Sequence, residues 1–101
     1  MKVLFICNQN QNRSKTAKDF FKHRFETKSA GLFCDEPVSK KELLWADTIV
    51  VMESKHRGEI AKRFPDVYLK KRILSLDIDD IYHYNQPKLV DILKSKIDEL
   101  L

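Results

Sequence analysis

The sequence predicts an α/β fold with three layers, α/β/α, built on a four-stranded parallel sheet. Short apolar runs alternate with helix-like segments along the 101 residues, which is the pattern of strands joined by crossover helices. The run Thr48 to Met52 is continuous and β-branched, as expected of a central strand with both faces buried. Because crossover connections are right-handed, few arrangements remain, and we expect the strand order 2-1-3-4.

The first part of the chain supplies two of these strands. The apolar run Lys2 to Ile6 predicts a short buried strand. A helix is expected from Ser14 to about Glu26, where apolar residues recur near helical spacing. Thr27 to Ala30 predicts the second strand, which ends at Gly31, and a loop then runs to Pro37.

The middle of the chain supplies two helices and the remaining edge of the sheet. Ser39 to Glu42 fits a capping box, in which a serine and a glutamate three residues later satisfy the first N–H groups of a helix. After the central strand, Ser54 to Phe64 is expected to be helical and to end before Pro65. Arg72 to Leu76 predicts the fourth strand.

The C-terminal part is expected to be a loop and one long helix. The loop covers Asp77 to Gln86, and the helix covers Pro87 to Leu101. The apolar residues of this helix form a stripe at helical spacing, which predicts one buried face. They are Leu89, Ile92, Leu93, Ile97, Leu100 and Leu101.

Composition predicts one globular domain over residues 1–101. Hydrophobic residues make up 43% of the chain, which fits a folded globule. No apolar run approaches the ~20 residues of a membrane span. Polar residues follow the apolar start at once, so it is too short for a signal peptide. We therefore expect a cytoplasmic protein with no membrane partner.

Charge and cysteine content narrow the class of ligand. The net charge of +4 suits an anionic ligand. Cys7 and Cys34 are too few for a disulfide framework. Together with the scattered His23, His56 and His83 they show no zinc-ligand spacing. We expect neither a cofactor nor a metal ion.

The segment from Cys7 to Ser14 has the layout of a thiol-based phosphatase loop. Five residues separate Cys7 from Arg13, between a strand and a helix. That length can wrap backbone N–H groups around one phosphate-sized dianion, next to a helix N-terminus that adds donors. Arg13 can hold two oxygens in a bidentate fork, and the Cys7 thiolate can attack the phosphorus. The expected substrate-binding residues of the loop are Asn8, Gln9, Asn10, Gln11 and Asn12.

Ser14 has two plausible roles beside the cysteine. Its hydroxyl can stabilise the thiolate, and it can donate to the sulfur as this leaves a phosphocysteine. The alternative is a buried structural thiol with Ser14 as a helix cap. That alternative leaves Arg13 unexplained, so we favour the catalytic interpretation.

Phosphate ester hydrolysis also needs a proton donor, and the loop after the fourth strand offers three. Asp77, Asp79 and Asp80 lie within four residues, and a single carboxylic acid can protonate the leaving oxygen and later activate water. We expect two of these three aspartates to stabilise a turn or the end of a helix instead of taking part in catalysis. On the residues alone, the choice between Asp77 and Asp80 stays open.

These segments together resemble the low-molecular-weight protein tyrosine phosphatase family, in particular its short bacterial branch. The cysteine loop has the spacing of that family, with Asn10 at the place of an asparagine three residues after the cysteine. Ser29 to Gly31 matches the end of the family's second strand, and Asp47 to Glu53 resembles its Asp-x-Ile-x-x-Met-Asp segment. Asp77 to Tyr82 resembles the segment that carries the general acid.

The resemblance implies specific roles. Asn10 would take a left-handed backbone turn, Asp80 would be the general acid, and Tyr82 would form a wall of the pocket, with His83 or Tyr84 as further candidates. The implied activity is hydrolysis of phosphate monoesters, phosphotyrosine-like ones above all, through a phosphocysteine. The implied partners are a phosphorylated protein or small phosphomonoester, with phosphate, sulfate or vanadate as ligand or inhibitor.

Several positions depart from the family pattern. Gln9 replaces a glycine, Lys15 and Ile81 each replace a proline, and Asn12 stands where many members have a second cysteine. A disulfide within the loop is therefore not available. The region after Gly31, which carries a cleft-lining aromatic in longer members, is short. The loop rim is unusually polar.

Other functions remain as alternatives. One is a phosphate-binding regulatory module without turnover, and another is a phosphatase acting on RNA or nucleotide phosphate ends. Nucleic acid is the less favoured partner because no aromatic and basic RNA-binding motif is present. Arsenate reduction would need further cysteines beside Cys34.

Four residues outside the motifs receive simple interpretations. Cys34 is expected to be a loop thiol, Trp45 to pack against the sheet, and His56 to lie on a helix surface. Glu53 ends the central strand and could approach the pocket, although we do not favour this.

Overall fold

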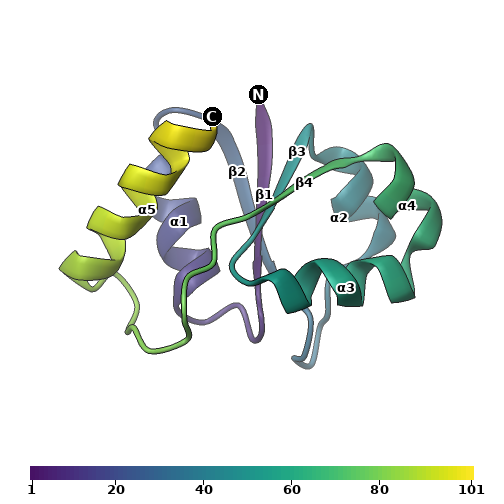
Figure 1. Cartoon of the computed structure of the whole chain (residues 1–101), viewed down its shortest axis with the longest axis horizontal. Helices are drawn as coiled ribbons and strands as arrows, with labels where there is room; N and C mark the ends of the chain where they lie inside the picture. Colours follow the sequence, from purple (N-terminus) through teal and green to yellow (C-terminus); the bar gives the residue numbers. More distant parts are fainter.

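Four parallel strands form one sheet in the order β2-β1-β3-β4, which confirms the predicted order. The structure is a computed structural model that describes all residues, 1–101. Figure 1 shows the sheet between two layers of helices, as the predicted α/β/α fold requires. The strands are β1 (Lys2–Cys7), β2 (Glu26–Gly31), β3 (Thr48–Val51) and β4 (Arg72–Ser75). The helices are α1 (Arg13–Phe21), α2 (Lys40–Trp45), α3 (Ser54–Arg63), α4 (Pro65–Lys70) and α5 (Pro87–Leu100).

Strand β1 lies at the centre of the sheet and divides the core into two clusters. Val3 and Phe5 point to one face, where α1 and α5 cover the sheet. Leu4 and Ile6 point to the other face, towards α2, α3 and α4. All four side chains are fully buried. This explains why the strand reads as a continuous apolar run rather than an alternating one.

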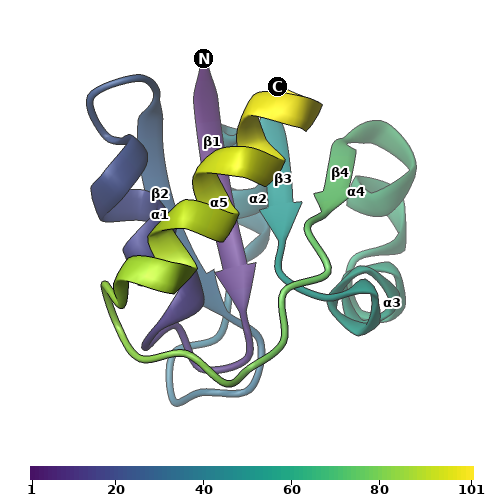
Figure 2. The same cartoon turned by 60° about the vertical axis from the view of Figure 1, so that its left-hand side comes forward.

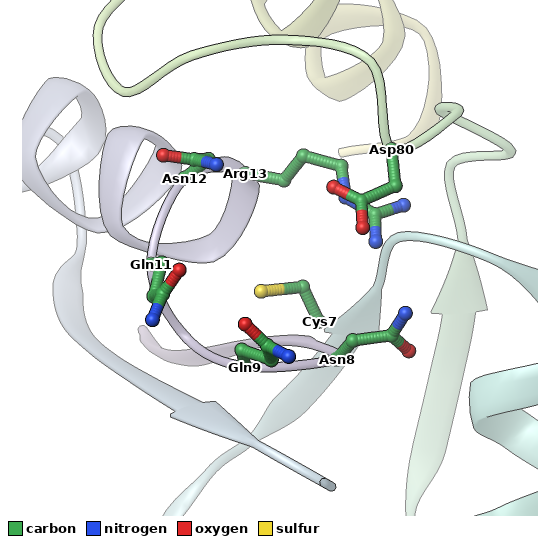
Figure 3. A pocket seen from close by; sticks show the side chains of 7 residues that line it. All are labelled: Cys7, Asn8, Gln9, Gln11, Asn12, Arg13 and Asp80. Carbon is green, nitrogen blue, oxygen red and sulfur yellow. The ribbon is translucent and has the colours of Figure 1, made fainter. Parts of the chain in front are cut away.

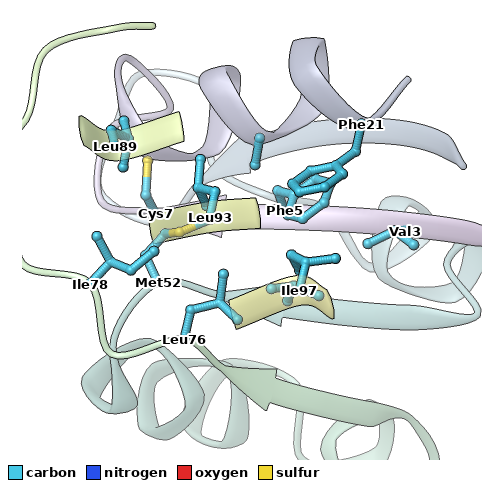
Figure 4. Packing of buried hydrophobic residues seen from close by; sticks show 12 residues of the cluster. Val3, Phe5, Cys7, Phe21, Met52, Leu76, Ile78, Leu89, Leu93 and Ile97 are labelled. Atoms are coloured by element: carbon cyan, nitrogen blue, oxygen red, sulfur yellow. The ribbon is translucent and has the colours of Figure 1, made fainter. Parts of the chain in front are cut away.

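Helix α5 closes the first cluster with part of its predicted stripe. Leu89, Leu93 and Ile97 are fully buried and pack towards β1 and α1, as Figure 4 shows. Phe5 and Phe21 stack in the same cluster, with ring centroids 6.0 Å apart. The remaining members of the stripe contribute less: Ile92 and Leu101 are partly buried, and Leu100 is 38% exposed.

Helix α1 is shorter than the sequence predicts. It ends at Phe21 instead of Glu26. The chain turns there, because the Arg24 and Phe25 N–H groups both donate to the Phe21 carbonyl. Glu26 is then the first residue of β2 and pairs with Lys2. Sheet pairing therefore overrides the local helical pattern over the last residues of the predicted helix.

Pro65 ends one helix and begins another, which the sequence analysis missed. Helix α3 ends at Arg63, and the six-residue helix α4 begins at Pro65 itself. Proline is favoured at the first helical position, where its missing N–H is not needed. The sequence pattern indicates Pro65 only as the end of the preceding helix. Helix α2, in contrast, begins with the predicted capping box of Ser39 and Glu42.

The parallel arrangement brings three loops to one end of the sheet. They follow β1, β3 and β4, and Figure 2 shows them below the strand arrowheads. Hydrogen bonds join these segments: the Met52 N–H donates to the Ile6 carbonyl (3.0 Å), and the Ile78 N–H donates to the Met52 carbonyl (2.8 Å). The carboxyl ends of parallel strands are where such folds bind ligands. None of the helices combines the length and apolar character that a membrane crossing requires.

Candidate active site

The loop between β1 and α1 curls around a small cavity of about 40 Å³. That volume is on the order of three water-sized groups, at roughly 10–15 Å³ each, which suits the three oxygens of a bound phosphoryl group. Figure 3 shows the lining side chains converging from the loop and from the segment after β4. They are Cys7, Asn8, Gln9, Gln11, Asn12, Arg13 and Asp80.

Cys7 lies at the floor of this cavity, at the end of β1. Its side chain is nearly fully buried. The sulfur is 2.9 Å from Ser14 Oγ and accepts a hydrogen bond from the Asn10 N–H (3.2 Å). Ser14 Oγ is also 2.9 Å from Asn10 Oδ1, to which it can donate. Since the hydroxyl has a single hydrogen, it can donate to Asn10 beside a thiol or to the sulfur beside a thiolate.

Asn10 shapes the loop instead of lining the cavity. Its φ is 55°, the left-handed turn that the family resemblance implies and that asparagine tolerates better than most residues. The loop also lies against Gly31 at the end of β2. A Cβ at Gly31 would come within 3.0 Å of Asn10 N and of Asn8 O. A glycine is therefore required for this close approach of the two backbones.

Arg13 forms one wall of the cavity and is almost completely buried. Its Nη1 donates to Glu53 Oε2 and to the Ile78 carbonyl, both at 2.6 Å. Its Nε and Nη2 are buried but have no hydrogen-bond partner in the chain. Buried donors without partners are costly. Two neighbouring donors of one guanidinium, next to a cysteine sulfur, form a fork suited to two oxygens of an oxyanion.

Glu53 reaches this site through Arg13, which the sequence analysis gave only as a minor alternative. Partial burial alone would raise the pKa of Glu53, but the hydrogen bond and charge of Arg13, with Lys55 and His56, outweigh it and lower that pKa. Glu53 is therefore ionised near neutral pH. A fixed carboxylate behind the guanidinium holds it in one orientation.

The acid loop places Asp80, and neither Asp77 nor Asp79, at the cavity. Asp80 Oδ1 is 3.6 Å from Arg13 Nε, and its side chain is 53% exposed. Asp77 has a φ of 56° and accepts hydrogen bonds from Ser75 Oγ (2.9 Å) and Ser54 Oγ (3.2 Å). Asp77 therefore stabilises the turn after β4.

The structure does not bring Tyr82 to the cavity. Its side chain is partly buried and packs against the α1–α5 side of the core. The two residues on either side of it point outward, since Ile81 is 71% exposed and His83 is also exposed. A segment without regular secondary structure gives no periodicity from which to predict which residues point inward. Tyr84 instead donates a hydrogen bond to Asp19 of α1.

The prediction that His56 lies on a helix surface is wrong, because its side chain is fully buried. It lies in the first turn of α3, where the Glu53 N–H donates to its Nδ1 (3.0 Å). Its Nε2 is 2.7 Å from Asn8 Oδ1 in the cysteine loop. The signal that could have revealed it is the spacing Glu53-x-x-His56, since the third helical residue often satisfies the N-cap N–H.

We expect His56 to make the fold less stable in acid. Burial, followed by the charge of Arg13, lowers the pKa of His56 from 6.5 to about 4. The unfolded chain thus takes up this proton near pH 6.5, whereas the folded chain takes it up only near pH 4. The free energy of unfolding should fall by about 3 kcal/mol as pH drops through this window, and stay unaffected by His56 above it.

Urea denaturation of the wild type and His56→Gln from pH 7.5 to 4 would measure this effect. The difference in stability between the two should shrink as pH falls, because glutamine does not titrate. His23→Gln, at an exposed position, is the control and should keep the wild-type slope. Equal slopes for the wild type and His56→Gln would contradict the assignment.

Two further features of the site region concern metals and the second cysteine. No cluster of histidine, cysteine, aspartate and glutamate side chains is arranged to hold a metal ion. Cys34 lies in the loop after β2, where it is partly exposed and its thiol donates to the Glu36 carbonyl (3.4 Å).

Comparison with known proteins gives matches in structure only. No protein-family model matches the chain, and neither does any curated protein sequence. The tyrosine phosphatase amsI of Erwinia amylovora superposes with a TM-score of 0.78, at 18% identity over 97% of this chain and 89% of that one. A low-molecular-weight protein tyrosine phosphatase from Bacillus subtilis gives 0.76, at 19% identity over 99% and 97%.

A third solved structure has a different stated activity. The YwlE arginine phosphatase of Geobacillus stearothermophilus gives a TM-score of 0.67, at 23% identity over 98% of this chain and 84% of that one. All three similarities run along nearly the whole chain. The chain therefore has the fold of the low-molecular-weight protein tyrosine phosphatases.

Proposed function

We propose that the protein is a cysteine-dependent phosphatase that hydrolyses phosphate monoesters through a phosphocysteine intermediate. One observation carries this proposal. The buried Cys7 sulfur shares a phosphate-sized cavity with two buried Arg13 donors that have no hydrogen-bond partner in the chain. A structural thiol would not require a buried arginine whose free donors face the same space. The fold shared with known phosphatases supports the same assignment.

The first chemical step transfers the phosphoryl group to Cys7. The thiolate sulfur attacks phosphorus as the bond between phosphorus and the leaving oxygen breaks. Asp80, in its protonated form, gives its proton to that oxygen, so the alcohol leaves neutral. The transition state is loose, with charge on three equatorial oxygens. Arg13 Nε and Nη2 and the backbone N–H groups of the loop are the donors that would bind them.

The second step returns the enzyme to its starting form. Asp80, now a carboxylate, takes a proton from water as the water oxygen attacks phosphorus. The sulfur–phosphorus bond breaks, and inorganic phosphate is released. Ser14 Oγ, 2.9 Å from the sulfur, donates a hydrogen bond to the departing thiolate and keeps its proton. Arg13 supplies the positive charge and the loop supplies N–H donors, so neither step calls on a metal ion.

The rim of the cavity bears on the choice of substrate. Six of the seven lining residues are polar or charged, and none is aromatic. Gln9 and Gln11 are exposed at the rim, where amides can both donate and accept hydrogen bonds. We propose a phosphorylated protein side chain or a small phosphomonoester as substrate, with phosphotyrosine-like esters as the first class to test. The polar rim and the net charge of +4 make RNA or nucleotide phosphate ends the second class.

The test is to capture the intermediate on the native chain. Wild-type protein and Cys34→Ser would be mixed with para-nitrophenyl phosphate and a chelator between pH 5 and 8, then denatured rapidly. We expect release of para-nitrophenol by both proteins and a phosphoryl group on the peptide that contains Cys7. Phosphate binding without turnover would favour the regulatory module. Turnover without a phosphocysteine would refute the mechanism.

Asp80→Asn should slow hydrolysis by about 10²-fold or more, the size expected for loss of general acid–base catalysis. Asparagine cannot give or take the proton, yet it keeps the size of the side chain. Phosphate affinity, measured by calorimetry, should persist or increase, because a negative charge near Arg13 is removed. Asp79→Asn, which changes an exposed neighbour outside the cavity, is the matched control. Equal losses in both variants would argue against Asp80 as the proton donor.

A further inference from the structure

His56 has hydrogen-bond partners at both ring nitrogens, and these partners fix its chemical form. The Glu53 N–H can only donate, so Nδ1, 3.0 Å away, must present its lone pair. A neutral imidazole then carries its hydrogen on Nε2. The Nε2–H donates to Asn8 Oδ1 at 2.7 Å. The ring cannot reverse these roles without losing the hydrogen bond to the backbone.

The fixed ring in turn fixes the orientation of the Asn8 amide. Its oxygen is engaged by His56, so its nitrogen, with two hydrogens, is the group left for the cavity that Asn8 lines. No atom of the chain accepts a hydrogen bond from this nitrogen. Figure 3 shows the Asn8 amide on the side of the cavity opposite Gln11, with its nitrogen towards Asp80. A flipped amide would instead present an oxygen, which repels a phosphate.

We propose that His56 is a positioning residue that acts through Asn8, keeping the Asn8 nitrogen aimed at an oxygen of the bound phosphoryl group. This inference rests on the proposed phosphatase function. His56 itself touches neither the cavity nor the reacting atoms, since it does not line the cavity. Asn8 would be the additional donor that completes the ring of N–H groups around the phosphate.

The first turn of α3 would then organise both sides of the cavity. The Glu53 carboxylate holds Arg13 through Nη1 (2.6 Å), and the Glu53 backbone N–H holds His56. His56 holds Asn8. A single helix start thus connects the Arg13 guanidinium with the Asn8 amide, which both line the cavity. Both contacts run from the start of α3, which follows β3, to the loop and the helix start that follow β1.

Paired substitutions can separate positioning from simple packing. Glutamine can place an N–H near the position of Nε2, so His56→Gln keeps the donor to Asn8. Asparagine can accept from the Glu53 N–H but is too short to reach Asn8, so His56→Asn keeps the cap alone. We expect His56→Asn to lower kcat/KM for para-nitrophenyl phosphate by about tenfold. His56→Gln should recover most of that loss, even where both variants melt at the same temperature.

Asn8→Ala provides a second test, at a partly exposed position where folding is less at risk. It should lower kcat/KM by about as much as His56→Asn, and the double variant should be little worse than either single one. Losses that multiply in the double variant would overturn the proposal. So would equal losses in His56→Gln and His56→Asn, since these would reflect burial instead of the donor.

Calorimetric titration of the same variants with inorganic phosphate distinguishes this inference from the proposed function. If the wild type binds phosphate but shows no turnover, the phosphatase assignment fails, and the affinities still test the positioning of Asn8. Weaker phosphate binding in His56→Asn and Asn8→Ala, restored in His56→Gln, would support it. Unchanged affinity in all variants, or no phosphate binding by the wild type, would overturn it.

Discussion

Replacing Cys7 by serine should lower kcat by at least about 10³-fold while phosphate binding persists, because only the nucleophile is changed. A serine hydroxyl is far less acidic than a thiol, so almost none of it is ionised at neutral pH. The donors that surround the sulfur, Ser14 Oγ at 2.9 Å and the Asn10 N–H at 3.2 Å, can still bind an oxygen. The loop geometry and the Arg13 fork should therefore stay intact.

Steady-state hydrolysis of para-nitrophenyl phosphate and calorimetric titration with phosphate would measure the two effects of Cys7→Ser. Cys34→Ser changes the other thiol, outside the cavity, and should keep wild-type kcat. Activity of Cys7→Ser within tenfold of the wild type would exclude Cys7 as the nucleophile. A loss of phosphate binding with a preserved fold would show that the sulfur also holds the loop together.

Arg13→Lys should lower kcat/KM by about 10³-fold, although the charge is conserved. The guanidinium makes two 2.6 Å hydrogen bonds through Nη1, to Glu53 and to the Ile78 carbonyl, and directs Nε and Nη2 to the cavity. One ammonium group cannot keep both anchors and also hold two oxygens. Both kcat and phosphate affinity should fall, since the fork binds oxygens in the ground state and more strongly in the transition state.

Arg57→Lys is the matched control, because Arg57 lies on the exposed side of α3. The stability of Arg13→Lys should be measured by urea denaturation beside the kinetics. The substitution leaves the buried ion pair with Glu53 incompletely hydrogen-bonded, which lowers the free energy of unfolding. A variant that stays folded and keeps more than a tenth of wild-type kcat/KM would refute the bidentate role of Arg13.

Much of the architecture could be predicted from the sequence because it depends on local patterns. The apolar run of β1, the β-branched run of β3 and the stripe of α5 each report burial directly. The capping box at Ser39 was predictable for the same reason, since its partners lie three residues apart. The incorrect secondary-structure predictions concern residues whose conformation depends on contacts with another helix or strand. Pairing with β1 converts Glu26 from the predicted helix into strand β2.

The cysteine loop could likewise be predicted from the sequence, because Cys7, Arg13 and Ser14 lie close together along the chain. The proton donor in the loop after β4 was harder to predict. Three acids lie in one loop, and only the folded chain shows that Asp77 binds Ser75 and Ser54 whereas Asp80 faces Arg13. The prediction that Tyr82 forms a wall of the pocket fails, since its side chain packs against the core. An irregular segment has no periodicity from which the orientation of this side chain could be predicted.

The order of the four strands, the position of the thiol loop and the anionic character of its expected ligand follow from the sequence alone. These follow from burial periodicity, from turn chemistry and from residues close along the chain. Which distant side chains support the loop becomes evident only in the folded chain. Glu53 is 40 residues from Arg13, and His56 is 48 residues from Asn8. Such pairs leave no local pattern, because their contact arises only when β1 and β3 lie side by side in the sheet.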